Sequence, residues 1–153
     1  MSNRRPEPLE HAKRVHEALR SKAALRSNAR GGGAEVEYVQ VGPGGTNDDI
    51  LRSLAPGSLV VNATGMGKDR PGSPLSDGAV FPERGNVWDF NYRGSLEFLR
   101  QAERQKTARG LFIEDGWVYF IHGWLQAIGE VFGVPTGPKE YGKLAGVAAA
   151  QRA

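Results

Sequence analysis

The sequence predicts an α/β fold in which a parallel sheet is flanked by helices. Short apolar runs such as Leu59-Val60-Val61 alternate along the chain with longer segments of helical periodicity. A polar or glycine residue follows each of several apolar runs, as at Asn62-Ala63-Thr64 and Asp115-Gly116. The chain has 153 residues, of which 39% are hydrophobic and 24% charged, values that suit one globular domain. Ligands of such sheets bind beyond the carboxyl ends of the strands.

The expected elements follow from local patterns. Helices are expected where apolar residues recur at helical spacing: Pro6–Arg26, a short helix after Thr46 or Asn47, a helix lined by Leu96, Leu99 and Ala102, Trp117–Phe132, and a small alanine-rich helix after Pro135. Strands are expected where short apolar runs lie between turn residues: Val36–Val41, Ser58–Ala63, Asn86–Phe90 and Leu111–Ile113. The stripe Trp117, Ile121, Trp124, Ile128 and Val131 is expected to face the core.

The segment from Thr64 to about Pro74 is rich in glycine, proline and charge, with almost nothing apolar to anchor it. Because it follows a strand that we expect to be buried, it is expected to line a binding crevice at the carboxyl end of that strand. An ordinary surface loop is the alternative.

Charge and composition exclude some classes of site. The net charge is +3, and basic residues concentrate in the N-terminal third, which suggests a nucleic acid, a phosphorylated ligand or simply a solvated helix face. The absence of cysteine excludes disulfides, thiolate metal sites and thiol nucleophiles. His11 and His16 diverge on a helix, so no metal site is expected. Without a signal peptide or a long apolar run, the expected location is the cytoplasm, with no membrane contact.

The N-terminus carries a specific signal. Asn3, Arg4 and Arg5 lie directly ahead of a helix that begins near Pro6. In dinucleotide-binding folds, the end of the second strand meets the adenosine ribose, where arginine pairs with the 2′-phosphate of NADP. These residues therefore predict NADP rather than NAD, with a disordered basic start as the alternative.

Several motifs together resemble the nucleotide-binding half of the shikimate dehydrogenase family. They are NRRPEPLEHA, VVNATGMG, VWDFNYRGSLEFLRQAE and IEDGWVYFIHGWLQAIGEVFG, in that order, and they span residues 3 to about 133. The resemblance implies a partial NADP-binding, Rossmann-like domain over residues 1–133 and a tail over 134–153. It also implies NADP-dependent interconversion of dehydroshikimate and shikimate, or of a related polyol such as quinate, in aromatic amino acid biosynthesis.

The resemblance assigns roles to individual positions. The residues implied to bind the cofactor are Asn3, Arg4 and Arg5 at the 2′-phosphate, and Asn62, Thr64 and Phe90 on the nicotinamide side. Gly116 matches a glycine whose backbone approaches the cofactor. Tyr92 matches a tyrosine on the substrate side. The family's substrate-binding glutamine falls on Gly123, so Tyr119 or Gln126 could supply that polar group, or the substrate differs.

Other parts of the family pattern have no counterpart in the chain. These are the catalytic lysine and aspartate of an N-terminal substrate domain, the first Rossmann strand and its glycine-rich turn. We therefore expect a sheet truncated at its N-terminus, no catalytic residue in this chain, and a substrate domain supplied in cis or in trans. A fragment of a longer dehydrogenase is the interpretation we favour, and a reduced relative is the other.

Two functional classes stay open at this point. The chain is either an oxidoreductase half or a non-catalytic nucleotide-binding or assembly module; nucleic-acid binding has the least support. With the first strand absent, the strand at Val36–Val41 is expected to lose its connection to the rest of the sheet. The free edge beside Leu59–Ala63 is then expected to favour association, including homo-oligomers.

Overall fold

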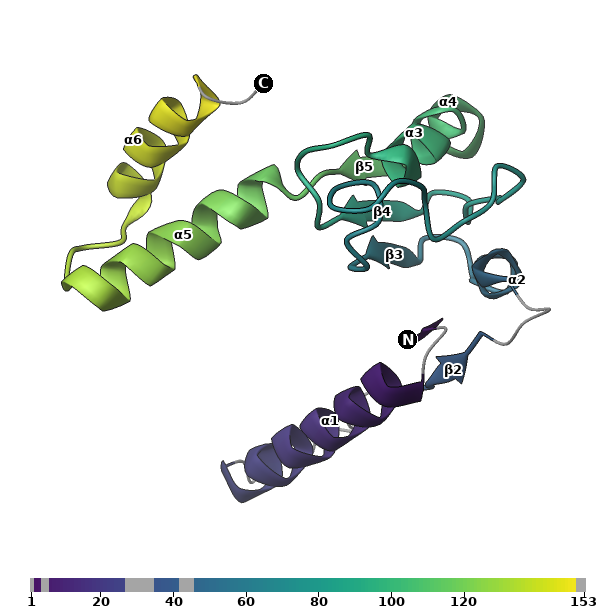
Figure 1. Ribbon diagram of the computed structural model, residues 1–153, viewed down its shortest axis with the longest axis horizontal. Coiled ribbons are helices and arrows are strands. Elements are labelled where there is room, and N and C mark those ends of the chain that lie inside the picture. Colours follow the sequence, from purple (N-terminus) through teal and green to yellow (C-terminus); the bar gives the residue numbers. More distant parts are fainter. Residues whose placement is uncertain (1, 4–5, 27–34, 42–45, 151–153) are drawn as a thin grey trace. The chain divides into compact units, whose positions relative to one another are not determined.

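The computed structural model describes residues 2–3, 6–26, 35–41 and 46–150 (Figure 1). Arg4 and Arg5 lie outside the described residues. The chain forms two compact units, Met1–Ile50 and Leu51–Ala153, and the boundary falls inside α2 (Asn47–Arg52). Among the described helices, none combines the length and the apolar character that crossing a lipid bilayer requires.

The first unit is a strand–helix–strand arrangement. β1 (Ser2–Asn3) and β2 (Val39–Gln40) are paired in parallel, and α1 (Pro6–Arg26) connects and contacts both. Pro6 suits the first helical turn, where a missing N–H costs no hydrogen bond. A hydrogen bond of 2.8 Å between His16 Nδ1 and the Tyr38 hydroxyl ties the helix to the segment before β2.

The predicted strand at Val36–Val41 is wrong in length, because only Val39 and Gln40 are paired. β1 offers two residues as ladder partners, so the neighbouring apolar residues find no strand to bond with. β1 and β2 form a two-stranded sheet that is not hydrogen-bonded to the other described strands.

The second unit contains a three-stranded parallel sheet of order β3-β4-β5. The strands are β3 (Leu59–Asn62), β4 (Asn86–Asp89) and β5 (Phe112–Glu114). Its other helices are α3 (Glu97–Glu103), α4 (Lys106–Arg109), α5 (Trp117–Phe132) and α6 (Pro138–Ala149). A loop joins β3 to β4, and α3 and α4 lie between β4 and β5. The parallel sheet with these helices confirms the predicted α/β class with flanking helices.

One face of this sheet carries the core. Val60, Val87 and Ile113 are in register on neighbouring strands and pack in a cluster with Phe81 and Phe98, whose rings meet edge to face at 5.6 Å. The cluster also contains residues from α2, the loop between β3 and β4, and the helical segment after β4: Leu51, Leu75, Ala79, Leu99, Ala102 and Leu111.

The loop from Thr64 to Gly85 is anchored to the core from Leu75 onward. Leu75, Ala79 and Phe81 reach the core. Buried Gln101 on α3 holds the loop backbone by donating from Nε2 to the carbonyls of Leu75 (3.3 Å) and Ser76 (3.1 Å). Few apolar residues are enough to hold this loop, because a side-chain amide supplies hydrogen bonds to backbone carbonyls that no secondary structure satisfies.

The opposite face is uncovered in this unit. Leu59, Val61 and Phe112 expose 59%, 40% and 63% of their surface, so the expectation of a buried strand at Ser58–Ala63 is wrong. The physical reason is the period of two along a strand: Val60 points into the core, and its neighbours point away from it. Only Asn62 of β3 is buried.

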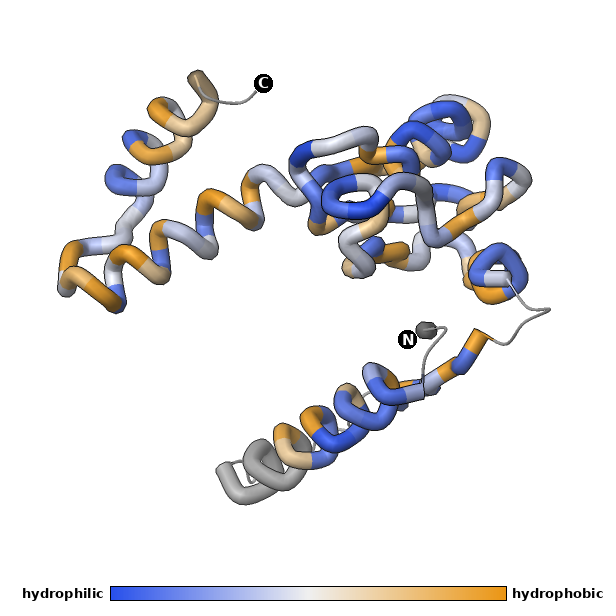
Figure 2. The backbone as a smooth tube through the Cα atoms, in the orientation of Figure 1, coloured by the Kyte–Doolittle hydropathy of each residue, from blue (hydrophilic) through white to orange (hydrophobic). Residues whose placement is uncertain are grey.

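Helix α5 starts at the carboxyl end of β5. Asp115 Oδ1 accepts a hydrogen bond of 2.9 Å from the Trp117 N–H, and Gly116 occupies the cap position itself. Figure 2 shows apolar residues all along α5. The stripe expected to face the core is buried only near its start: Ile121 is buried, whereas Trp124 and Val131 are 54% and 74% exposed. The hydrophobic period alone could not show that the helix extends beyond the sheet.

Candidate functional site

Three strand ends that are distant in the sequence meet at the carboxyl edge of the sheet. The Phe90 N–H donates to the Asn62 carbonyl at 3.0 Å, and the Gly116 N–H donates to the Asn91 carbonyl at 2.9 Å. The ends of β3, β4 and β5 are thus tied together, as the polar residues after each apolar run predicted. In parallel sheets, this edge is where ligands bind.

A buried polar cluster lies beneath this edge. Asn62 Nδ2 donates to Asp89 Oδ2 at 3.1 Å, and the Asn91 N–H donates to Asp89 Oδ1 at 2.9 Å. Asn91 Nδ2 also donates to the Met66 carbonyl at 2.9 Å, which ties the following loop to the cluster. Asn62, Asp89 and Asn91 are all buried, and no buried side-chain polar atom of the described residues lacks a hydrogen-bond partner. The cluster therefore fixes the edge as a preorganised unit.

The Asp89 carboxyl is the perturbed acid of this cluster. Burial raises its pKa above the ordinary value, hydrogen bonds from Asn91 and Asn62 oppose the rise, and the nearby charge of Asp115 adds to it. A buried carboxyl of this kind is typical both of functional sites and of structural networks. Because all its described hydrogen bonds stay inside the cluster, its evident role is to position the strand ends.

Gly116 permits a close approach of two backbones. A methyl group at this position would overlap the Phe90 carbonyl oxygen and would lie 2.5 Å from its carbonyl carbon. Both atoms belong to the backbone, so they cannot swing aside as a flexible side chain would. The start of α5 can therefore reach the end of β4 only with glycine at position 116.

The loop after β3 begins with a turn built on its own side chains. The Thr64 hydroxyl donates to Asn62 Oδ1 at 2.7 Å and accepts from the Met66 N–H at 3.2 Å. Farther along, the loop packs against the segment after β4: a methyl on Gly94 would overlap the Gly67 carbonyl, and the Leu96 N–H donates to that carbonyl at 3.1 Å. Leu96 has a φ of 48°, a left-handed conformation that is unusual for leucine and that this contact maintains.

Aromatic side chains gather beside the polar edge. Tyr119 stacks on Phe90 with ring centroids 4.9 Å apart, and the Trp88 ring meets Tyr119 nearly at a right angle, 6.0 Å away. Tyr92 stacks separately on Phe120 at 4.1 Å. The rings of Trp88, Phe90 and Tyr119 form one group beside β4. The rings of Tyr92 and Phe120 form a second group at the first turns of α5.

Tyr92 also meets a positive charge. The Lys68 ammonium lies 5.8 Å from the centroid of the Tyr92 ring, and the same ammonium pairs with Asp69 Oδ2 at 3.3 Å. Asp69 is shared with Arg93, whose Nη2 lies 3.2 Å from Oδ1. Asp69 and Arg93 are solvent-exposed and Lys68 is half-buried, so the pairs contribute little to stability.

Of the residues predicted for the site, Asn62, Thr64, Phe90, Tyr92, Gly116 and Tyr119 lie in one region of the second unit. Gln126 lies farther along α5, where it is exposed and donates to Glu130 Oε1 at 3.0 Å on its own helix. Asn3 belongs to the first unit, at the end of β1. Arg4 and Arg5 lie outside the described residues.

Sequence reasoning missed two members of the buried cluster, Asp89 and Asn91. The available signal was an acidic residue inside an otherwise apolar strand, in Val87-Trp88-Asp89-Phe90. A carboxylate at such a position requires hydrogen-bond partners. Burying a neutral polar group without a hydrogen bond costs on the order of 2–7 kcal/mol, and burying an unpaired ion costs more.

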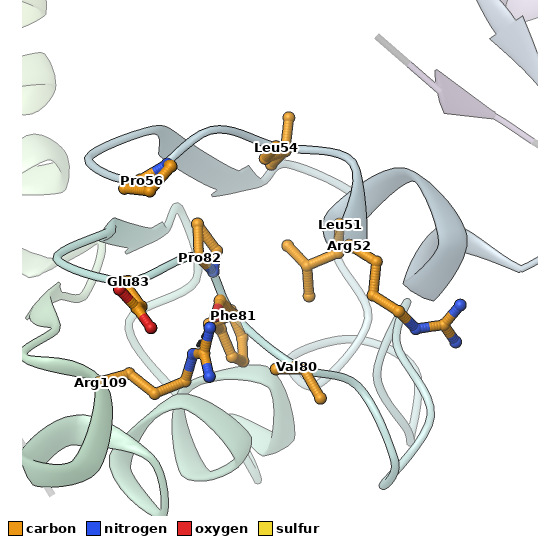
Figure 3. A pocket seen from close by; sticks show the side chains of 9 residues that line it. All are labelled: Leu51, Arg52, Leu54, Pro56, Val80, Phe81, Pro82, Glu83 and Arg109. Carbon is orange, nitrogen blue, oxygen red and sulfur yellow. Dashed lines mark hydrogen bonds between the residues drawn. The ribbon is translucent and has the colours of Figure 1, made fainter.

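The described part of the second unit includes two hollows on different sides of the sheet's strand ends. One, of about 410 Å³, lies where β3 and β4 begin, between α2, the end of the long loop and Arg109 (Figure 3). Figure 3 shows the Arg109 side chain beside Phe81 and Glu83, and Arg109 Nε donates to the Phe81 carbonyl. The other, of about 360 Å³, lies next to the aromatic group at the carboxyl edge. The second hollow is therefore the one on the side of the sheet where ligands are expected.

Comparison of the chain with protein-family models, with curated proteins and with solved structures gives no match.

Proposed function

We propose that the chain is the nucleotide-binding half of an NADP-dependent oxidoreductase resembling shikimate dehydrogenase. The observation that carries the proposal is the convergence of Asn62, Phe90 and Gly116 at one edge of a parallel sheet. These residues come from three motifs separated by long stretches of sequence, and each motif resembles a cofactor-side motif of that family. The parallel β1–α1–β2 arrangement supports the proposal from the first unit.

The proposed roles follow the motifs. Asn3, Arg4 and Arg5 bind the 2′-phosphate; Asn62 and Thr64 shape the nicotinamide side, with Phe90 and Gly116 beside the ring. Bound NADP would exchange hydride with a carbon of a polyol such as shikimate or quinate. Tyr92 and Tyr119 serve the substrate side, and Gln126 is a further candidate there. Proton transfer belongs to a lysine and an aspartate of a separate substrate domain.

In this proposal, the fold is Rossmann-like, and a strand and a glycine-rich turn from outside these residues complete it. Two consequences follow for the chain's own residues. The small size of Gly116 lets the first turn of α5 approach the cofactor edge, and the internally satisfied cluster of Asn62, Asp89 and Asn91 holds that edge rigid.

Cofactor binding tests the proposal directly. The chain is titrated with NADP and with NAD by calorimetry, first as wild type and then with Arg4→Ala and Arg5→Ala combined. Each charge-assisted hydrogen bond is worth about 1.5–3 kcal/mol, so the double variant is expected to weaken NADP by at least about tenfold and to leave NAD unchanged.

A matched control removes the same amount of charge elsewhere. Lys139→Ala with Lys143→Ala changes two exposed cations of α6 and is expected to leave NADP affinity unchanged. Absence of NADP binding, or equal losses for NADP and NAD in the arginine variant, would contradict the proposal.

The second candidate is a non-catalytic nucleotide-binding or assembly module that works with a separate substrate domain. It is favoured by the internal satisfaction of Asp89, because the described hydrogen bonds of this buried carboxyl stay inside the cluster with Asn62 and Asn91. Incubation with NADP and shikimate or quinate separates the candidates. The full open reading frame should produce NADPH if it is an oxidoreductase and should bind NADP without producing NADPH if it is a module.

A further inference from the structure

The hollow at the carboxyl edge has aromatic walls. Its lining consists of Trp88, Glu114, Asp115, Val118, Tyr119 and His122. Trp88 is held in place because its Nε1–H donates to the Asp115 carbonyl at 3.1 Å. Tyr119 is held by stacking on Phe90, with 15° between the ring planes. The Trp88 and Tyr119 rings therefore form a fixed corner, 88° apart, on which a ligand can rest.

The charged side chains that line the hollow are both acidic. Glu114 ends β5, and Asp115 follows it. The positive end of α5 lies nearby, but Asp115 Oδ1 accepts from the first-turn N–H of Trp117 and offsets that partial charge. Neither lysine nor arginine contributes to the lining. The local field thus favours a positive ligand, although the walls are mainly apolar.

These two features define one ligand chemistry. Aromatic faces attract cations through the ring quadrupole, most strongly for tryptophan, and carboxylates add direct attraction. A hollow of about 360 Å³ has room for a small molecule. We propose that this hollow binds a compact organic cation, with Trp88 and Tyr119 as its walls and Glu114 as its charge partner.

Two molecules share this chemistry. One is the positively charged, ring-alkylated pyridinium of an oxidised nicotinamide, which would connect the hollow to the proposed NADP function. The other is a quaternary ammonium group, which would make the site independent of that function. The proposal concerns the cation site, and the two sources are separated by the choice of probe.

Each probe is paired with a neutral molecule of the same shape. Nicotinamide methylated on its ring nitrogen is compared with nicotinamide, and choline with the alcohol in which carbon replaces the ammonium nitrogen. The full chain is titrated with each, and the Trp88 indole N–H is followed in proton–nitrogen correlation spectra. Trp88→Phe assigns that signal among the three tryptophans of the chain.

At least one cation is expected to shift the Trp88 signal saturably and to bind about fivefold or more tightly than its neutral counterpart. Glu114→Gln should weaken the cation about fivefold and leave the neutral molecule unchanged. Glu83→Gln is the matched control, because Glu83 lines the other hollow. Tyr119→Leu, which removes one wall, should abolish the preference for the cation and serves as the second variant if Glu114→Gln does not fold.

Binding of the pyridinium alone identifies a nicotinamide source, and binding of choline alone identifies an ammonium source. The proposal is overturned if neither cation shifts the signal, if the neutral molecules bind equally well, or if Glu114→Gln and Tyr119→Leu both leave the preference intact. Failure of NADP to bind while choline binds would refute the proposed function and leave the cation site standing.

Discussion

Replacement of Gly116 by alanine tests whether the close approach of α5 to β4 stabilises the second unit. The added methyl would overlap the Phe90 carbonyl oxygen and lie 2.5 Å from its carbon. Neither side can yield easily, because the Phe90 N–H is bonded to Asn62 and the Gly116 N–H to Asn91. Overpacking costs about 1–3 kcal/mol, occasionally more. Because both atoms that would clash with the methyl belong to the backbone, we expect Gly116→Ala to lower the unfolding free energy by about 3 kcal/mol.

Urea unfolding followed by tryptophan fluorescence measures this loss. All three tryptophans lie between residues 88 and 124, so the signal reports the second unit. Gly123→Ala is the matched control on the same helix: nothing lies within 4 Å of its added methyl, and the change should stabilise the unit by about 0.5–1 kcal/mol. Equal unfolding free energies for Gly116→Ala and the wild type would refute the steric argument.

Three other changes address the cluster, the open edge and the loop. Asn62→Asp places a second carboxylate beside buried Asp89, where the amide nitrogen now lies 3.1 Å from Oδ2, and should lower the unfolding free energy at neutral pH by about 3 kcal/mol. Both folded-state pKa values are then raised, so the native state binds more protons: stability should be recovered in acid and lost as pH rises, and a pH-independent loss would contradict this. Val61→Lys places a charge on the exposed apolar edge of β3 and should reduce self-association in sedimentation equilibrium; a wild-type chain that is monomeric at all concentrations would disprove the association. Gln101→Ala removes the amide that holds the Leu75 and Ser76 carbonyls, so it should cost about 2 kcal/mol and speed proteolysis of the long loop, and unchanged cleavage would argue against that anchor.

Much of the fold was predictable because the decisive signals are local. The strand at Leu59–Val61 and the helix at Trp117–Phe132 follow from apolar runs and helical period within a few residues. The strand at Val36–Val41 was predicted too long, because pairing depends on the two partner residues of β1. A strand exists only where another strand lies beside it, and that is a nonlocal condition.

The candidate site was predictable in its position and less so in its composition. The convergence of the three strand ends was predictable because polar or glycine residues after apolar runs mark strand ends, and the ends of parallel strands share one edge. The choice of Asn62, Phe90 and Gly116 within it came from the family resemblance. Asp89 and Asn91 were missed because their importance depends on burial and on partners from another strand. Gln126 was predicted as a substrate-binding residue from helical spacing alone. That spacing shows which residues share a face of α5, but it cannot show which of them lie beside the sheet.

The sequence by itself determined the order of elements, the parallel α/β class and the strand ends at which polar residues gather, since these depend on periodicity and on turn residues. Only the tertiary structure decided which sheet face is covered, that Gln101 holds the long loop, and that Gly116 must lack a side chain. The physical reason is range: a dihedral preference acts within a few residues, whereas burial, steric overlap and a hydrogen bond between Asn62 and Asp89 require distant segments to meet.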